Sequence, residues 1–206
     1  RPSTGPGPIT LDPDLPPLAA DGEISVADLA HDSRDDLYRT PYGAVQAGTV
    51  VTLRLRAAAG DLTEASVRIY DPRAQGQVII PMQVAARDGT GGEHGYDYWQ
   101  VELPTINLPT VLYYRFIARD GTATRYVEDD AAFDGGAGQV LEASADASWQ
   151  IVTYEPDFAT PSWAAGATVY QVFPDRFANG NPANDPSPDA VPGAASTERY
   201  RYGDVY

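Results

Sequence analysis

Alternation of apolar and polar side chains with a period of two is the feature that most constrains this sequence. In residues 51–56 the valine and leucine side chains fall on one face of an extended chain, and the threonine and arginine side chains fall on the other. Similar β-rich runs, with turn residues between them and almost no helical periodicity, follow at 67–70, 78–84, 98–103, 111–119, 122–127 and 150–154. This pattern predicts an immunoglobulin-like antiparallel β-sandwich.

One connection in this series has a specific turn signal. Residues 111–119 and 122–127 flank Asp120-Gly121, a dipeptide that tolerates the positive φ angles of a type I′ turn. The sequence therefore predicts a hairpin centred on that dipeptide.

The character of the chain changes at both ends of the sandwich. Residues 1–21 are rich in proline and glycine and indicate an extended leader, and residues 22–155 hold the predicted sandwich. Residues 156–206 begin with a linker, and 167–173 then form a nearly continuous apolar run, which is typical of a strand buried on both faces in a parallel barrel. No partner strand follows in 174–206, so we expect another segment to complete the barrel.

The charge and composition exclude several classes of protein. With 43% hydrophobic residues the chain can form a packed core, and its formal charge of −15 disfavours nucleic acid and anionic membrane surfaces as partners. There is no cysteine, no run of roughly 20 apolar residues that could span a bilayer, and no basic-then-apolar leader before Arg1. We expect a soluble chain from which any signal peptide has been removed.

Two parts of the chain resemble one family of enzymes. Residues 169–186, VYQVFPDRFANGNPANDP, resemble the first barrel strand and following loop of glycoside hydrolase family 13, in its neopullulanase, cyclomaltodextrinase and amylopullulanase branch. Other segments resemble the starch-associated carbohydrate-binding module family 34 that precedes the barrel in that branch, namely 31–33, 38–42, 49–56, 113–116 and 149–154. The order of the two parts along the chain matches the family.

The resemblance implies the N-terminal part of a secreted α-glucan hydrolase with a (β/α)8 catalytic barrel. The implied substrates are starch, pullulan and maltodextrins, with α-1,4 bonds as the main target, α-1,6 bonds as a second one and a retaining mechanism. In relatives the catalytic carboxylates lie farther along than Tyr206, so no catalytic residue is assigned and the chain alone is expected to be inactive. A second chain, produced by nicking around Asp204, is expected to carry the rest of the catalytic domain, and a dimer is one candidate assembly.

Residues Asn179, Asn181, Asn184 and Asp185 form a candidate metal site. They offer carbonyl and carboxylate oxygens within one compact loop, and calcium prefers six to eight such ligands. The same residue types are also ordinary turn formers. The resemblance implies that these positions bind structural calcium, with further ligands from a segment after Tyr206, so we expect the chain by itself to bind calcium poorly.

The aromatic residues Tyr96, Tyr98 and Trp99 are candidates for carbohydrate binding, because they follow a glycine-rich stretch and flat aromatic faces stack on pyranose rings. Packing within the sandwich is the other interpretation of each ring. The pairs Asp35-Asp36 and Asp129-Asp130 are interpreted as solvated turn charges. His31 and His94 are isolated, and we interpret His94 as solvated and His31 as a residue that orders the entry to the first strand.

Two alternatives to the enzyme hypothesis remain open. The first is a stand-alone carbohydrate-binding module without catalysis. The second is a purely structural sandwich that mediates dimer contacts. If everything beyond Pro156 were removed, a binding module would keep its affinity for glucan, whereas a structural sandwich would show none.

Overall fold

The computed structural model describes residues 20–88, 95–105, 107–164, 166–171 and 183. By its internal contacts the chain divides into two units, Arg1–Ala159 and Thr160–Tyr206, and every strand of the described residues lies in the first. None of the described residues belongs to a helix that is long and apolar enough to cross a membrane.

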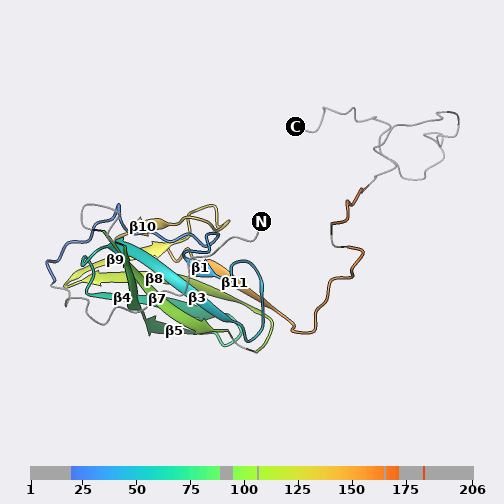
Figure 1. Cartoon of the computed structure of the whole chain (residues 1–206), viewed down its shortest axis with the longest axis horizontal. Helices are drawn as coiled ribbons and strands as arrows, with labels where there is room; N and C mark the ends of the chain where they lie inside the picture. Colours follow the sequence, from blue (N-terminus) through green and yellow to red (C-terminus); the bar gives the residue numbers. More distant parts are fainter. Residues whose placement is uncertain (1–19, 89–94, 106, 165, 172–182, 184–206) are drawn as a thin grey trace, which may run out of the picture. The chain divides into compact units, whose positions relative to one another are not determined.

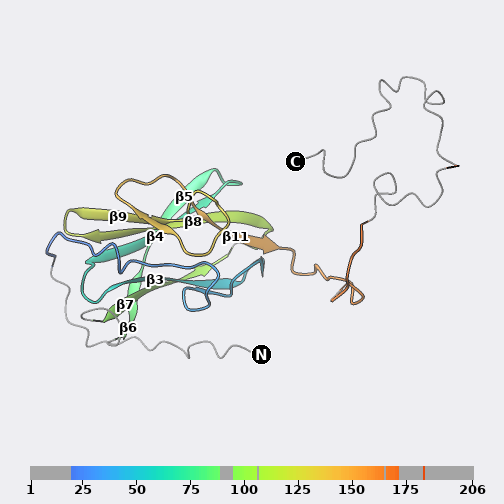
Figure 2. The same cartoon turned by 90° about the horizontal axis from the view of Figure 1, so that it is seen from above.

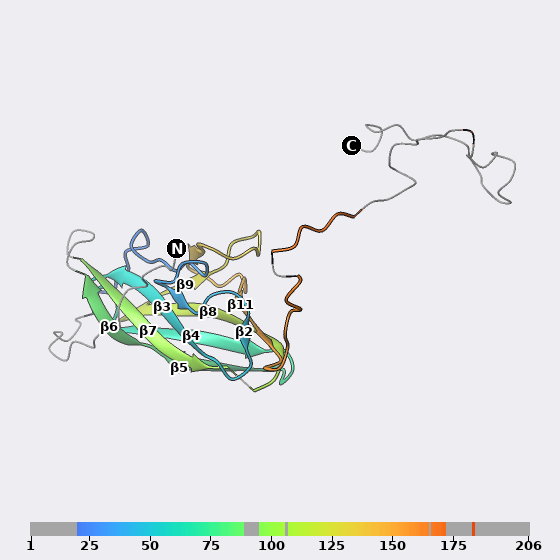
Figure 3. The same cartoon turned by 45° about the vertical axis from the view of Figure 1, so that its right-hand side comes forward.

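The first sheet is antiparallel and has four strands in the order β1-β3-β7-β6. These strands are β1 (Arg39–Thr40), β3 (Val50–Ala58), β7 (Tyr96–Pro104) and β6 (Gln83–Asp88). The register of β3 on β7 places Leu55 opposite Trp99, and both side chains are buried. Figure 3 shows β3, β7 and β6 side by side.

The second sheet is built around the long strand β8. Its seven strands are β8 (Thr110–Asp120), β4 (Glu64–Asp71), β5 (Gly76–Pro81), β9 (Ala123–Glu128), β10 (Gln139–Leu141), β11 (Trp149–Tyr154) and β2 (Val45–Gln46). Strand β4 pairs with one edge of β8, and β11 and β9 pair with successive halves of its other edge. Strand β5 extends the sheet beyond β4 (Figure 1). Strand β2 joins β11 in parallel, unlike the antiparallel pairs around it (Figure 3).

The two sheets form separate layers with one apolar core between them (Figure 2). The period of two along each strand sends alternate side chains inward. Leu53 and Leu55 of β3 are fully buried, as are Phe116 of β8 and Ile151 of β11. The predicted β-sandwich is confirmed.

The apolar run predicted at 78–84 is divided between the two sheets. Strand β5 ends at Pro81, and β6 begins at Gln83 in the opposite sheet. Proline has no N–H group to extend the ladder with β4. Met82 lies at the crossing, where its side chain is buried and its N–H donates to the Ala65 carbonyl. The single run is therefore two strands joined by a buried residue.

The hairpin between β8 and β9 is confirmed, but its turn is displaced by one residue. Asp120 pairs with Ala123, so the central residues are Gly121 and Thr122, and only Gly121 has a positive φ, at 52°. A positive φ at the first central residue alone is typical of type II′, so the type I′ prediction is wrong. The Asp120 carboxylate instead accepts the N–H groups of Asp21 and Gly22 at 2.8 and 2.7 Å.

The predicted barrel strand is not formed among the described residues of the second unit. Residues 167–171 have no regular secondary structure, and Val169 and Tyr170 are 84% and 87% exposed. Val172 and Phe173, the rest of the predicted strand, lie outside the described residues. A parallel strand buried on both faces needs strands beside it and helices over it, and the described part of this unit supplies neither.

Candidate functional site

The predicted calcium ligands Asn179, Asn181, Asn184 and Asp185 all lie outside the described residues, so calcium binding stays a prediction. Within the residues that the structure does describe, no group of three or more His, Asp or Glu side chains is placed to hold a metal ion.

The predicted sugar-binding aromatics do not share a surface, although all three lie on β7. Trp99 points into the core and is 6% exposed, while Tyr96 and Tyr98 lie on the outer face of the four-stranded sheet. Successive residues of a strand point to opposite faces, so Trp99 cannot stack on the same ligand as its two neighbours. The tryptophan therefore belongs to the core, which agrees with the alternative interpretation that this ring packs within the sandwich.

Tyr96 and Tyr98 belong to a layer of side chains that contact one another. The guanidinium carbon of Arg56 lies 4.3 Å from the centroid of the Tyr96 ring. The Tyr98 ring lies 6.5 Å from that of Tyr38, and burial is the main cause that raises the pKa of both phenols. These contacts use ring surface that the prediction assigned to a sugar.

A second tyrosine pair, missed by the sequence interpretation, lies on the outer face of the other sheet. Tyr70 of β4 and Tyr113 of β8 are direct cross-strand partners, with ring centroids 6.4 Å apart and ring planes inclined at 47°. The alternation of apolar and polar residues could have placed both tyrosines on the outer face. Each follows a core residue, Ile69 or Leu112, and successive strand residues point to opposite faces. Their adjacency depends on the register of β4 on β8, which the local sequence does not specify.

Charged side chains lie beside this tyrosine pair. The Arg68 guanidinium carbon is 5.1 Å from the Tyr70 centroid, and Arg68 Nε donates to Gln77 Oε1 at 2.8 Å. Asp146 Oδ1 lies 2.5 Å from Arg115 Nη1 and 3.7 Å from Arg68 Nη1. This ion-pair cluster fixes the Arg68 side chain next to the ring.

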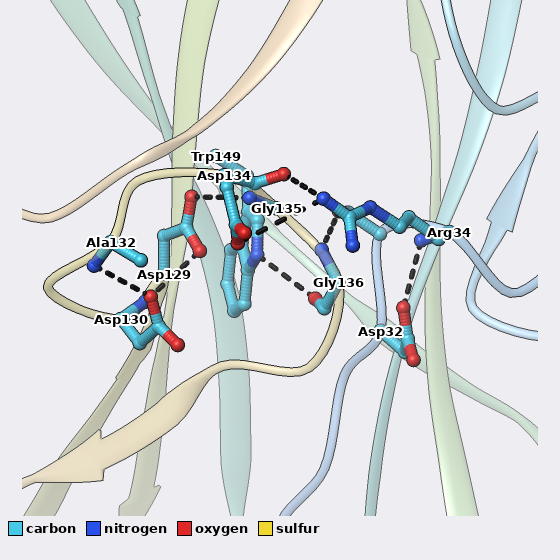
Figure 4. Close-up of polar contacts among 10 residues, drawn as sticks. Asp32, Arg34, Asp129, Asp130, Ala132, Asp134, Gly135, Gly136 and Trp149 are labelled. Carbon is cyan, nitrogen blue, oxygen red and sulfur yellow. Dashed lines mark hydrogen bonds and ion pairs between the residues drawn. The ribbon is translucent and has the colours of Figure 1, made fainter. Parts of the chain in front are cut away.

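The connection between β9 and β10 carries the predicted acidic pair Asp129-Asp130, and Figure 4 shows its contacts. Asp129 Oδ1 accepts the Asp130 N–H at 3.0 Å, and Asp129 Oδ2 accepts the Gly135 N–H at 3.3 Å. Arg34 contacts Asp134 through its guanidinium, and Trp149 Nε1 donates to the Gly136 carbonyl at 3.2 Å. The connection is thus held both to the segment around Arg34 and to the core.

Asp129 is not a solvated turn charge, so that interpretation is wrong for this residue. Its side chain is 3% exposed, and burial, with the nearby carboxylates of Asp130 and Asp134, raises its pKa. Loss of hydration disfavours the charged form of a carboxyl group. The carboxyl group stabilises the loop through its two backbone contacts.

His31 is a structural residue at the centre of an aromatic cluster. Its Nδ1 lies 2.8 Å from the Arg54 carbonyl, which can only accept, so Nδ1 carries the proton and Nε2 accepts the Tyr114 hydroxyl at 3.0 Å. Burial lowers the pKa of His31 to about 3, with the nearby Arg39 charge acting in the same direction and the bond to Arg54 opposing it. The imidazole is therefore neutral, which fits the predicted role in ordering this segment.

Comparison with known proteins gives several related sequences, whereas no family model matches the chain. An amylopullulanase of Thermoanaerobacter thermohydrosulfuricus is 36% identical over 171 residues, which cover 82% of this chain and 11% of that protein. Neopullulanase 2 of Thermoactinomyces vulgaris is 28% identical over 138 residues, covering 67% of this chain and 22% of the relative. A solved cyclomaltodextrinase structure superposes with a TM-score of 0.45 and 27% identity over 78% of this chain and 25% of its own.

The amylopullulanase match extends beyond the sandwich. It covers a larger share of the chain than residues 1–154 contain, so it must include residues after β11 even if it began at Arg1. The chain itself spans only about a tenth of the length of this relative. At least the beginning of the segment after the sandwich is therefore part of the shared sequence.

Proposed function

Because the homologues of this chain over most of its length are amylopullulanases, a neopullulanase and cyclomaltodextrinases of glycoside hydrolase family 13, we propose that it forms the N-terminal part of a secreted α-glucan hydrolase. The proposed substrates are starch, pullulan and maltodextrins. The α-1,4 bonds are the main target, and the α-1,6 bonds are a second one.

The extension of the amylopullulanase match past β11 is the observation that carries this proposal. A sandwich can be joined to many unrelated proteins, so similarity within residues 22–155 alone favours a binding module as much as an enzyme. Shared sequence on both sides of the domain boundary favours a sandwich followed by a catalytic domain.

The proposed chemistry lies outside this chain. Retaining glycosidases place a nucleophilic carboxylate and a general acid about 5 Å apart and pass through a covalent glycosyl intermediate. Neither role is assigned to a described carboxyl group, since the described acidic residues have structural contacts or are exposed on strands and turns. The rest of the barrel, on a second polypeptide that associates with this one, is proposed to supply both groups.

Calcium is the proposed cofactor, with Asn179, Asn181, Asn184 and Asp185 as part of its shell. Amide and carboxylate oxygens are the ligands that calcium prefers, and all four residues are of these types. The metal would stabilise the loop that follows the first barrel strand, and it would take no direct part in bond cleavage.

A stand-alone binding or structural module is the second candidate function. It is favoured by the self-contained core of the sandwich, since every buried core residue in the described part of the chain lies between Leu29 and Ile151. A sandwich of this kind can fold without the barrel.

Hydrolysis of pullulan and starch by the purified native protein tests the proposal. We expect release of reducing sugar, and proton NMR of the first products should show the α-anomer, because a retaining enzyme keeps the configuration of the cleaved bond. A native protein that binds these glucans and releases no sugar would support the module instead. Initial release of the β-anomer would refute the retaining mechanism while leaving the hydrolase proposal intact.

A further inference from the structure

The outer face of the seven-stranded sheet has a row of side chains that runs straight across four strands. The registers of β5 on β4, of β4 on β8 and of β8 on β11 place four residues opposite one another in sequence. In that order they are Gln77, Tyr70, Tyr113 and Gln150. We call this set the Gln-Tyr-Tyr-Gln row; its four strands lie in one layer in Figure 2.

The row combines two ring faces with hydrogen-bonding groups at each end. Tyr70 and Tyr113 are partly exposed, and Gln77 and Gln150 are exposed. Three strand spacings separate its ends, which gives a length of about 14 Å. Arg68 lies on one side of the row and Val152, which is 39% exposed, lies on the other side.

We propose that the Gln-Tyr-Tyr-Gln row is a binding platform for an α-1,4-glucan chain. A sugar ring has an apolar C–H face, which stacks on tyrosine, and a rim of hydroxyl groups, which bond to amide and guanidinium groups. Two adjacent tyrosines with glutamines beyond them offer both kinds of contact along one line. This inference rests on the proposed function for the identity of the ligand.

The ring geometry and the charge narrow the ligand class. The two ring planes are inclined at 47°, which suits a curved chain such as an α-1,4-glucan better than a flat β-linked one. The row contains no charged residue, and the formal charge of −15 on the chain disfavours a polyanion. A neutral oligosaccharide fits both observations.

The platform differs from the site that the sequence predicted. Tyr96 and Tyr98 lie on the outer face of the other sheet, where Arg56 and Tyr38 contact their rings. Tyr70 and Tyr113 contact each other within the row, and the Arg68 guanidinium carbon lies 5.1 Å from the centroid of the Tyr70 ring. The two tyrosine pairs can therefore be tested against each other with the same substitution.

Calorimetric titration of the 206-residue chain with maltoheptaose tests the platform. Tyr70→Ala and Tyr113→Ala should each weaken binding about tenfold, since each removes one stacking surface. Tyr70→Phe should keep the affinity within about threefold because the ring remains. Tyr96→Ala is the matched control on the other sheet and should leave the affinity unchanged, and cellohexaose should bind at least tenfold more weakly than maltoheptaose.

The outcomes separate this inference from the proposed function. If wild-type chain binds maltoheptaose and only Tyr96→Ala weakens it, the platform is wrong and the glucan ligand stands. If folded wild-type chain shows no affinity, the platform is also wrong, while hydrolysis by the native protein still decides the proposed function. Circular dichroism of each variant ensures that loss of affinity is not loss of folding.

Discussion

At the scale of single residues, His31 has the most consequential environment in the described chain. It is 2% exposed and packs against the rings of Tyr38, Tyr114, Phe116 and Trp149. Burial disfavours its charged form, the Arg54 carbonyl holds a proton on Nδ1, and Nε2 of the neutral ring accepts from the Tyr114 hydroxyl. Proton uptake by this side chain must therefore oppose folding.

We predict that His31 makes the folded state less stable in acid. Its pKa is about 3 in the folded chain against about 6.5 in the unfolded chain, so the unfolded state binds the extra proton between those values. The free energy of unfolding should decrease as the pH is lowered through that window, by at most about 1.4 kcal/mol per pH unit from this group. Above pH 6.5 the contribution is complete and constant.

Urea unfolding of wild type and His31→Gln from pH 4 to 8 measures this contribution. The difference between the two free energies of unfolding should shrink as the pH falls, because the glutamine has no proton to gain. His94→Gln is the control, which should follow the wild-type curve since we interpret His94 as solvated. If the difference in free energy of unfolding between wild type and His31→Gln did not depend on pH, His31 would be charged or hydrated in the folded chain.

At the scale of elements, the connection from β9 to β10 has a close backbone approach at its end. Gly138 lies just before β10, and a Cβ atom there would collide with the Glu128 carbonyl oxygen and the ring of Trp149. The Trp149 ring is 1% exposed and has no room to move away. The chain therefore requires a residue without a side chain at this position.

Gly138→Ala should destabilise the protein by about 3 kcal/mol, the upper part of the usual range for overpacking. Gly76→Ala in β5 is the matched control. Its added Cβ would have only the Ala74 carbonyl within reach, at 3.7 Å, so its effect should stay within about 0.5 kcal/mol. Urea unfolding followed by tryptophan fluorescence measures both variants. Equal stability of the two would show that the loop relaxes around residue 138.

The sequence predicted strands better than it predicted how they pair. Alternation located β3, β4, β7, β8, β9 and β11, because each has one face in the core. It did not divide 78–84, since the crossing at Met82 is as apolar as the strands around it. It also placed Trp99 with Tyr96 and Tyr98, although the same alternation separates their faces.

The tyrosine pair of the candidate site illustrates the same limit. Tyr70 and Tyr113 are distant in sequence, and only the register of β4 on β8 makes them neighbours. Register is set by which faces are buried across the whole sheet, so no local motif encodes it. The calcium prediction has a local basis, because its four candidate ligands lie close together in the sequence.

At the scale of the whole molecule, the proposed calcium site would connect this chain to the rest of the proposed enzyme. The four candidate ligands would supply only part of a shell of six to eight oxygens. The 206-residue chain should therefore bind calcium more weakly than about 10⁻³ M, the weak end for extracellular modules, whereas the native protein should bind it well.

Thermal unfolding with and without a chelator measures this difference. Chelation should lower the melting temperature of the native protein and leave that of the 206-residue chain unchanged. Asn181→Ala should reduce the chelator effect in the native protein, and Asn107→Ala, outside the loop, should preserve it. If the chelator left the melting temperature of the native protein unchanged, the result would argue against a structural calcium ion.

Native mass measured together with hydrolysis tests the central claim most directly. The purified native protein should elute at a mass well above the 22.1 kDa of this chain, with pullulan- and starch-hydrolysing activity in the same fractions. Denaturing electrophoresis of those fractions should show a second polypeptide that carries the rest of the barrel. A single inactive species of 22.1 kDa would contradict the account and identify the chain as a binding or structural module.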